Sequence, residues 1–303
     1  VFLPRVPGRG AAGSRTPLVT YNGRILLFGG SGQLGTAVRR LHPDVVAPSS
    51  REVDLASIRA SDIEDLIQQH QPQLVINCAA YTKVDQAEEE EALATKVNGD
   101  AIGLLAEVTS TRSLPFVTFS TDYVFGGNVN RPYREEDPPQ PVNAYGRSKV
   151  VGERLALAAN PRSLVIRTSW LISGSHPNFV ATILRRARSG TRLQVVDDQH
   201  GCPTVADDLA TATLKAVAAR SEGLLHLVNQ EATTWFELAQ EAVRLAGFDL
   251  GLVSPCGSAD YPTAATRPRY SVMATDRARA LGIQLPSWKD SLPNVVTELL
   301  GWV

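Results

Sequence analysis

Cysteine is scarce in this sequence, and neither sign of charge is in excess. The three cysteines, Cys78, Cys202 and Cys256, are odd in number and widely spaced, which excludes a disulfide framework and a cysteine-based zinc site. Such usage is typical of a reducing compartment, so we expect a cytoplasmic protein. Lysine plus arginine number 30 and aspartate plus glutamate 31, and a net charge of −1 gives no general attraction to nucleic acid or to an anionic membrane.

Long apolar runs and clustered histidines are also missing. No run reaches the roughly 18 residues of a membrane-spanning helix, and the five histidines are scattered at positions 42, 70, 176, 200 and 226. We therefore expect no membrane partner, no nucleic acid partner and no metal site, although the acidic pair 197–198 leaves binding of a divalent ion open. With 43% hydrophobic content in 303 residues, the chain can bury a sizeable core in one or two domains.

Residues 1–22 differ in character from the remainder of the chain. They include Arg5, Arg9 and Arg15, several glycines and prolines, and no acid. This composition predicts a flexible N-terminal extension, because it cannot support a packed element, and it lacks the apolar core of a secretory signal. An organelle-targeting segment and a gene-start artefact both remain open.

From residue 23 onward, short apolar runs alternate with segments of helical periodicity. This alternation predicts a parallel sheet covered by helices on both faces, which is a doubly wound α/β fold. In such a sheet, ligands bind beyond the carboxyl ends of the strands. The predicted strands cover residues 24–28, 44–47, 73–78, 115–120, 164–168 and 225–228.

A glycine-rich turn follows the first predicted strand. Gly29, Gly32 and Gly35 are spaced three apart, with Gln33 and Leu34 between the last two, and a helical pattern follows. Glycine lets the backbone take unusual dihedrals and approach a pyrophosphate closely, and a helix N-terminus attracts that anion. The turn therefore predicts a dinucleotide-binding site, as in a Rossmann domain.

The segment after the second predicted strand bears on the choice of cofactor. An NAD-preferring site places an acid about 20 residues beyond the glycines, whereas this chain has Ser50 and Arg51 there. Because an arginine can bind a 2′-phosphate with two hydrogen bonds, we expect NADPH, with NADH still possible. Asp54 is a candidate for the adenine amino group. A solvated loop with an incidental arginine is the alternative.

Tyr145 and Lys149 are four residues apart, so they lie on one side of a helix. We expect the ammonium of Lys149 to lower the pKa of the Tyr145 phenol, so that this group can exchange a proton with a substrate. Thr121, at the end of a predicted strand, can polarise the same substrate oxygen. A chance surface pair is the alternative for Tyr145 and Lys149 taken alone.

The carboxyl end of the third predicted strand contributes small residues to the same crevice. Cys78, Ala79 and Ala80 allow a cofactor to approach the backbone closely. Asp85, with Glu88 three residues later, resembles a capping box that starts the next helix. Asn98, further along, is expected to orient Lys149 through a water or to brace the sheet.

Together these motifs resemble the extended short-chain dehydrogenases/reductases, and within them the dTDP-4-dehydrorhamnose reductase family. The resemblance spans the chain from about residue 24 to the C-terminus. Its most specific part is Asp-Asp-Gln-x-Gly-x-Pro-Thr at 197–204, although Cys202 within it departs from the pattern. The other matching segments are 29–35, 77–80, 120–125, 145–149, 167–170, 178–180, 233–235 and 267–271.

This resemblance implies reduction of the 4-keto group of dTDP-6-deoxy-L-lyxo-4-hexulose to dTDP-L-rhamnose. Tyr145 would donate the proton, Thr121 would share the growing negative charge, and Lys149 would hold the nicotinamide ribose. Trp170 would lie beside the sugar or base, with an ordinary core aromatic as the alternative. The substrate-binding residues implied by the resemblance are Asp122, Val124, Trp170, Asn178, Gln199 and Arg267, with Arg267 as the charge partner of the diphosphate.

The expected organisation is a Rossmann-type sheet with a smaller C-terminal lobe. Residues 23–169 form the NADP(H)-binding domain, and residues 170–303 form mainly the substrate-binding lobe, with a return to the sheet near 193–228. Helices are predicted at 235–246 and 289–300, and a lid at 261–275. A homodimer remains open, but residues 36–38 contain no carboxylate for the metal-bridged dimer described for some family members.

Two other functions remain open at this stage. A non-catalytic regulatory subunit of methionine adenosyltransferase resembles the same fold and can bind NADP. A nucleotide-sugar epimerase or dehydratase would use the same threonine, tyrosine and lysine without net consumption of the cofactor.

Overall fold

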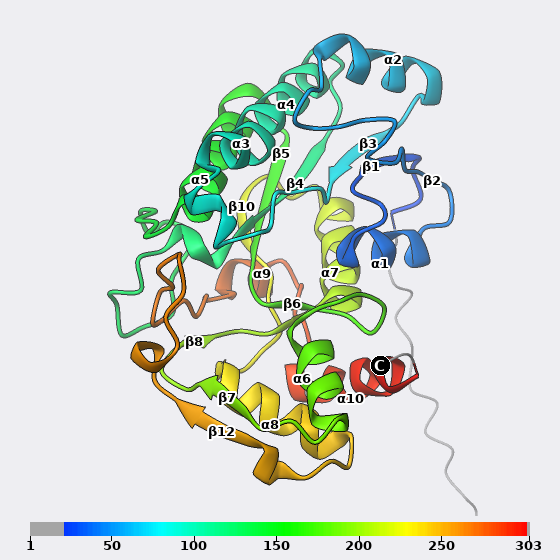
Figure 1. Cartoon of the computed structure of the whole chain (residues 1–303). Coiled ribbons are helices and arrows are strands. Elements are labelled where there is room, and N and C mark those ends of the chain that lie inside the picture. The colour runs from blue at the N-terminus through cyan, green and yellow to red at the C-terminus, as the bar shows by residue number, and fades with distance from the viewer. Residues whose placement is uncertain (1–20, 302–303) are drawn as a thin grey trace, which may run out of the picture.

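The computed structural model describes residues 21–301, so the predicted extension, 1–22, lies outside the described residues except for Tyr21 and Asn22. Its centre is a six-stranded, entirely parallel sheet in the order β10-β5-β4-β3-β1-β2 (Figure 1). This arrangement confirms the predicted α/β fold class. The strands are β1 (Ile25–Phe28), β2 (Val45–Val46), β3 (Leu74–Asn77), β4 (Phe116–Thr121), β5 (Ser163–Thr168) and β10 (Gly223–His226).

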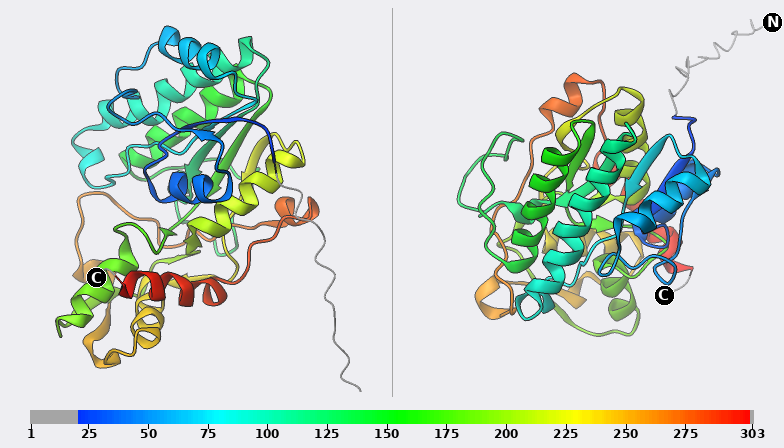
Figure 2. Two further views of the ribbon diagram at one scale, coloured as in Figure 1. Left: turned by 90° about the vertical axis from the view of Figure 1, so that its right-hand side faces the viewer. Right: turned by 90° about the horizontal axis from the view of Figure 1, so that it is seen from above.

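Alternate residues of the buried strands supply two separate cores. In β1, Ile25 and Leu27 pack on one face of the sheet, and Leu26 and Phe28 on the other, as the two-residue period of a strand requires. Helices therefore cover both faces (Figure 2). The first face carries α1 (Gln33–Leu41) and α7 (Ala206–Ala218), and the second carries α2 (Ala60–His70), α4 (Ala101–Thr111) and α5 (Ala144–Ala159).

A smaller lobe lies below the sheet in Figure 1 and has its own core. Three helices, α6 (Phe179–Arg188), α8 (Trp235–Leu245) and α10 (Trp288–Leu300), surround that core, and the last two match the predicted helices. Short paired strands complete the lobe. They are β6 (Leu171–Ile172), β7 (Leu193–Val196), β8 (His200–Gly201), β9 (Thr204–Val205), β11 (Thr233–Thr234) and β12 (Val253–Cys256).

The C-terminal half returns to the large sheet through α7 and β10. The strand β10 pairs with β5 at the sheet edge, and α9 (Asp276–Ala280) packs beside it. By contrast β7, which lies inside the expected return segment, pairs with β12 in the smaller lobe. The return to the sheet thus runs from Ala206 to His226.

The predicted capping box at Asp85 is wrong. The Asp85 carboxylate instead accepts a hydrogen bond from the backbone of Ala265 and pairs with Arg267, so it is not available to cap a helix. The chain first makes a single 3-10 turn and begins α3 only at Glu91. The remaining short elements are η1 (Gln86–Glu88), α3 (Glu91–Thr95), η2 (Lys96–Asp100), η3 (Asp122–Val124), η4 (Leu250–Leu252) and η5 (Ser258–Asp260).

Over residues 21–301, no helix combines the length and the apolar character that crossing a membrane requires.

Candidate active site

The three glycines of the turn between β1 and α1 differ in how much space a Cβ would have. Gly29 has a left-handed backbone, φ +76°, and a Cβ there would overlap the backbone of Ala79. A Cβ on Gly35 would overlap the carbonyl oxygen of Gly29, so α1 packs directly on the turn. At Gly32 a Cβ would meet only one atom, at 3.5 Å. Gly29 and Gly35 are thus required by the fold, whereas Gly32 leaves open space in front of the helix.

The N-terminus of α1 carries free backbone donors. Gln33, Leu34 and Gly35 are its first residues, and their N–H groups have no intrahelical partner. The side chain of Leu34 is buried, and that of Gln33 turns away to bond the carbonyl of Leu171 and the hydroxyl of Ser173. These two residues therefore present backbone rather than side-chain groups to an anion at this end.

Ser50 and Arg51 are exposed in the turn that follows β2. Within residues 21–301, the Arg51 guanidinium has no hydrogen bond or ion pair, so it is free to bind a phosphate. Asp54 is engaged locally, because its carboxylate accepts hydrogen bonds from Ala56 N and Ser57 Oγ. The expected contact of Asp54 with adenine would have to compete with this turn.

Two asparagines fix the segment that follows β3. Asn77 bonds both the N–H and the carbonyl of Ala79. Asn98 does the same for Tyr81 and also donates to Ser148 Oγ. Asn98 thus joins the segment after β3 to α5, and the expected orientation of Lys149 through a water stays a prediction. Cys78, Ala79 and Ala80, the predicted cofactor contacts of this segment, are half-buried.

Tyr145 and Lys149 lie on α5, and Thr121 ends β4. Thr121 Oγ1 accepts a hydrogen bond from Tyr123 N and donates one to Asp122. Burial, followed by the charge of Asp122, raises the pKa of Tyr145 to about 12, and a hydrogen bond with Thr121 acts in the opposite direction. The predicted lowering of this pKa by Lys149 is therefore wrong for the protein without its ligands. Burial also lowers the pKa of Lys149 to about 8.

Two hydroxyl groups between these elements are buried without a partner. They are Ser120 Oγ and Thr168 Oγ1, near the carboxyl ends of the adjacent strands β4 and β5. Buried polar groups are normally hydrogen-bonded. These hydroxyls, the free donors of α1 and the unpaired ammonium of Lys149 fit a polar dinucleotide that lies across the ends of the strands.

A cavity of about 570 Å³ opens beside this site, in the smaller lobe. Three arginines line it, Arg186, Arg192 and Arg267, and no carboxylate does. Such a lining suits an anionic ligand, and the volume falls in the range of small-molecule sites. The remaining wall consists of Tyr123, Phe179, Thr182, Ile183, Leu193, Gln194, Val195, Val196, Gln199, Trp235, Tyr261 and Thr263.

Arg267 is in the predicted place but is already neutralised. Its guanidinium forms a two-fold ion pair with Asp85, with an Nη2–Oδ2 distance of 2.6 Å, and also contacts Tyr123. Gln199 lies in the cavity wall and donates a hydrogen bond to Ser258 Oγ. The substrate contact of Gln199 stays a prediction that its place in the cavity wall allows, whereas Arg267 would have to share its charge with Asp85.

The structure places Asp122 and Val124 away from any open surface. The Asp122 carboxylate is buried, and it accepts a hydrogen bond of 2.6 Å from Ser271 Oγ in the C-terminal half. Burial raises its pKa to about 6. The Val124 side chain is fully buried beside Phe125 and Tyr133. Direct contact of either side chain with a substrate, as the sequence predicts, does not fit this packing.

Trp170 and Asn178 also serve the fold. The Trp170 ring is 9% exposed and stacks on Trp235 at 3.7 Å between centroids, so the alternative of a core aromatic is the one that fits. Asn178 caps α6 by accepting from Ala181 N, and its amide donates to the carbonyl of Ser173. Its polar atoms are thus used within the protein.

Arg186 and Arg192 are cavity residues that the sequence analysis missed. Both are exposed, and neither side chain has a hydrogen bond or ion pair within the described part of the chain. A signal did exist, since Phe179, Thr182 and Arg186 repeat at helical spacing on the side of α6 that faces the cavity. The pattern becomes informative only when the orientation of α6 is known.

The acidic pair 197–198 is occupied by hydroxyl partners. Asp197 accepts from Thr234 Oγ1, and Asp198 accepts from Ser258 Oγ and N. In the described residues 21–301, no three His, Cys, Asp or Glu side chains are grouped so that they could hold a metal ion.

Comparison with known proteins places this architecture in a family. Residues 23–300 match the RmlD substrate binding domain. A dTDP-4-dehydrorhamnose reductase from Streptomyces griseus is 38% identical, with 92% of this chain and 94% of that protein covered. A probable dTDP-4,6-dihydroxy-2-methyloxan-3-one 4-ketoreductase from Streptomyces antibioticus is 40% identical, with 91% and 96% covered.

Solved structures agree with this result. The dTDP-4-dehydrorhamnose reductase from Bacillus anthracis, in complex with NADP, superimposes with a TM-score of 0.87 at 33% identity, and the match covers 92% of this chain and 100% of that one. The chain therefore belongs to the RmlD substrate binding domain family and has the extended short-chain dehydrogenase/reductase fold of the dTDP-4-dehydrorhamnose reductases.

Proposed function

We propose that the protein uses NADPH to reduce the 4-keto group of dTDP-6-deoxy-L-lyxo-4-hexulose, giving dTDP-L-rhamnose. The broader assignment, an oxidoreductase acting on dTDP-4-keto sugars, follows from the family and from the reductases among its relatives. The observation that carries the proposal is the position of Tyr145 and Thr121. Tyr145 packs against Tyr123, which lines the cavity with the arginines, and Thr121 ends β4 at the same edge of the parallel sheet as the glycine turn after β1.

The residues that would hold NADPH are the turn 29–35, Arg51, the segment 78–80 and Lys149. NADP is bound in the related reductase from Bacillus anthracis. When bound, this cofactor supplies the hydride that reduces the carbonyl carbon. The free N–H groups at the start of α1 suit its pyrophosphate, and Arg51 suits a 2′-phosphate, which NADH lacks.

The proton needed for the reduction is held on Tyr145. With a pKa of about 12, its phenol is protonated at neutral pH, which is the form that a proton donor requires. An alkoxide is a stronger base than a phenolate, since the hydroxyl group of an alcohol or of water is a weaker acid than a phenol. Transfer from Tyr145 to the reduced oxygen is therefore favourable, and Thr121 can share the growing charge.

The cavity beside Tyr145 supplies the features that a nucleotide sugar requires. Arg186 and Arg192 are unpaired cations suited to a diphosphate. The aromatic rings of Phe179 and Tyr261 offer apolar surface to a base. We propose these residues, with Gln199 and Arg267, as the substrate contacts.

A second candidate substrate is another dTDP-4-keto sugar. Relatives with different names support it, including the Streptomyces antibioticus protein and a dTDP-4-keto-6-deoxy-D-glucose reductase from Streptomyces niveus that is 37% identical over 86% of this chain and 91% of its own length. The two candidates differ in the configuration of the sugar carbons beside the ketone, not in the chemistry at C4.

The test is a comparison of kcat/KM for the L-lyxo sugar and for dTDP-4-keto-6-deoxy-D-glucose, each with NADPH. The proposal predicts at least about 100-fold preference for the L-lyxo sugar, since sites that hydrogen-bond hydroxyl groups discriminate strongly. Preference for the other sugar would transfer the assignment to it. An epimerase would convert substrate without net loss of NADPH, and a regulatory subunit would bind NADPH without turnover of either sugar.

A further inference from the structure

An ion pair is buried between α5 and the sheet, behind the proposed active site. Arg167 of β5 donates two hydrogen bonds to Glu153 of α5, from Nε at 2.8 Å and from Nη2 at 2.7 Å. The two side chains are 1% and 4% exposed. Because the desolvation cost of such a pair often cancels its attraction, stability alone is a weak reason for its presence.

Glu153 continues the line of side chains that begins with the proposed proton donor. Tyr145, Lys149 and Glu153 follow at intervals of four residues, so they lie along one side of α5. Lys149 and Glu153 are both buried, yet they form no direct ion pair, because Arg167 binds both oxygens of the Glu153 carboxylate. The carboxylate is thus fixed one helical turn from Lys149, while the ammonium has no ion-pair partner among the described residues.

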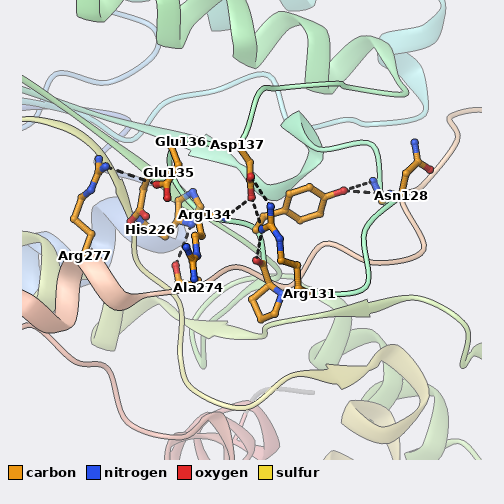
Figure 3. A network of polar contacts seen from close by, with 12 residues as sticks. Asn128, Arg131, Arg134, Glu135, Glu136, Asp137, His226, Ala274 and Arg277 are labelled. Atoms are coloured by element: carbon orange, nitrogen blue, oxygen red, sulfur yellow. Dashed lines mark hydrogen bonds and ion pairs between the residues drawn. The ribbon is translucent and has the colours of Figure 1, made fainter.

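Contacts with residues other than Glu153 also fix the Arg167 side chain. Its guanidinium lies over the Phe125 ring, 5.0 Å from the centroid, and Nη1 donates to the carbonyl of Glu135. The carboxylate of Glu135 accepts from the backbone N–H of His226, whose ring contacts the carbonyl of Ala274 (Figure 3). Burial, reinforced by the charge of Arg167, lowers the pKa of His226 to about 3. His226 is therefore neutral and does not repel the arginine.

We propose that the Arg167–Glu153 pair is a positioning device for Lys149, which holds a carboxylate one turn away so that the buried ammonium keeps its charge. Arg167 and Glu153 are positioning residues in this account, since both side chains are buried and bound to each other. The proposal rests on the proposed function only in the part assigned to Lys149, the binding of NADPH.

The electrostatics around Lys149 agree with this geometry. Burial lowers its pKa to about 8, and the charge of Glu153 is what opposes that shift. Without Glu153 the ammonium would lose its proton closer to neutral pH. Arg167 carries the opposite charge and binds the same carboxylate, so it offsets part of the effect of Glu153. The other ionisable groups on elements packed against α5 are Glu88, Glu91, Lys96, Asp100, Glu107, Asp122 and Tyr123, and Glu153 is the charge that acts on Lys149 most strongly.

The first test measures the charge of Lys149 without cofactor or substrate. The rate of its acylation by acetic anhydride is followed against pH by peptide mass spectrometry, since only the neutral amine reacts. We expect a midpoint near pH 8 in the wild type and about one pH unit lower in Glu153→Gln, as expected for loss of a nearby opposite charge. Asn160→Ala is the matched control. It removes a buried polar side chain at the other end of α5 and should leave the midpoint unchanged.

The second test measures NADPH binding by fluorescence titration. Wild type and Glu153→Gln should bind equally at pH 6, and the variant about fivefold more weakly at pH 8, because a smaller fraction of Lys149 is charged. If Glu153→Gln does not fold, the double variant Glu153→Leu/Arg167→Met removes both charges and should shift the midpoint and the binding in the same direction, but by less, because the Arg167 cation is removed together with the carboxylate. An unchanged midpoint together with unchanged pH dependence of binding would show that the pair is only structural and overturn the proposal. Failure of the proposed sugar reduction would leave the acylation result unaffected.

Discussion

Of the three arginines that line the cavity, one is paired with a carboxylate and two are not. Arg267 is 17% exposed and is paired with Asp85, whereas Arg186 and Arg192 are exposed and unpaired. A cation that already has a carboxylate partner offers less to an incoming diphosphate. The charge available to a substrate therefore comes chiefly from α6 and from the start of β7.

Replacement of Arg186 or Arg192 by alanine should raise KM for the dTDP-sugar about tenfold or more, with little change in kcat, because each change removes a charged hydrogen-bond donor. Steady-state kinetics at saturating NADPH would measure this. Arg185→Ala is the control, since Arg185 is exposed on the same helix but does not line the cavity. An equal effect of Arg185→Ala would point to general electrostatics instead of direct contact.

Arg51 governs the choice between the two nicotinamide cofactors in this account. Arg51→Ala should weaken NADPH binding about tenfold or more and leave NADH binding nearly unchanged, because only NADPH carries the 2′-phosphate. Dissociation constants for both cofactors, measured by fluorescence at one salt concentration, would decide this. Equal weakening of the two would remove Arg51 from the cofactor site.

At the scale of elements, the turn from β1 to α1 allows its folding role to be separated from its binding role. Gly35→Ala should lower the free energy of unfolding by about 1–3 kcal/mol, because the new methyl group overlaps the carbonyl of Gly29. Gly32→Ala should change it by less than about 1 kcal/mol, since a Cβ fits at the N-cap. Urea unfolding of both variants would measure these changes.

Cofactor binding should be affected by Gly32→Ala, the variant that changes the stability little. Gly32→Ala places a methyl group in front of the free N–H groups of α1 and should weaken NADPH at least about tenfold, a loss of about 1.4 kcal/mol. If Gly32→Ala instead binds NADPH normally, the pyrophosphate does not lie at this end of the helix.

Much of this element structure could be predicted from the sequence. The six strands of the large sheet are apolar runs bounded by glycine, proline or polar residues, which is the sequence pattern of a fully buried parallel strand. The paired two-residue strands of the smaller lobe have no recognisable sequence pattern, because they form only when distant segments meet. Asp85 shows the same limit, since its partner Arg267 lies 182 residues away in sequence.

The candidate site was predictable to the same degree. Local spacing predicts Tyr145 and Lys149 on one side of a helix and Thr121 at the end of a strand, and the structure has them on α5 and at the end of β4, while their roles in catalysis stay predictions. The direction of the pKa shift of Tyr145 was not predictable, because it depends on how much protein surrounds the phenol. Trp170 and Asn178 occur in family motifs, yet their partners in the folded chain, Trp235 and the cap of α6, give them packing roles.

At the scale of the whole molecule, polar contacts join the sheet to the C-terminal half across the proposed substrate site. Gln33 bonds Ser173, Asp85 pairs with Arg267, and Asp122 accepts from Ser271. Each contact links a residue near the end of a strand to a segment of the later half. The two lobes are thus held together at the place where the cofactor and the sugar would meet.

Acid should weaken the fold through His226, which ends the edge strand β10 and is buried against Phe125 and Ala274. Its pKa is about 3 in the folded protein and 6.5 when exposed, so the unfolded state binds the extra proton as the pH falls below 6.5. The stability is therefore complete above that pH and is lost as the pH falls towards 3, by about 1.4 kcal/mol per unit. Between pH 7 and pH 5 the wild type should lose about 2 kcal/mol more than His226→Gln.

Urea unfolding at several pH values would measure this difference. His70→Gln is the control, because His70 is only half-buried at the end of α2 and this change should leave the pH dependence of the wild type intact. Parallel curves for the wild type and His226→Gln would show that His226 is not the group responsible.

The central claim is tested most directly by the absorbance of NADPH at 340 nm after addition of freshly prepared dTDP-6-deoxy-L-lyxo-4-hexulose, with Tyr145→Phe measured in parallel. The account predicts that the wild type oxidises one NADPH per sugar. Tyr145→Phe should bind NADPH nearly as well but react at least about 100-fold more slowly, because it has no proton to donate. A wild-type protein that binds NADPH without oxidising it, or a Tyr145→Phe variant that keeps most of the rate, would contradict the account.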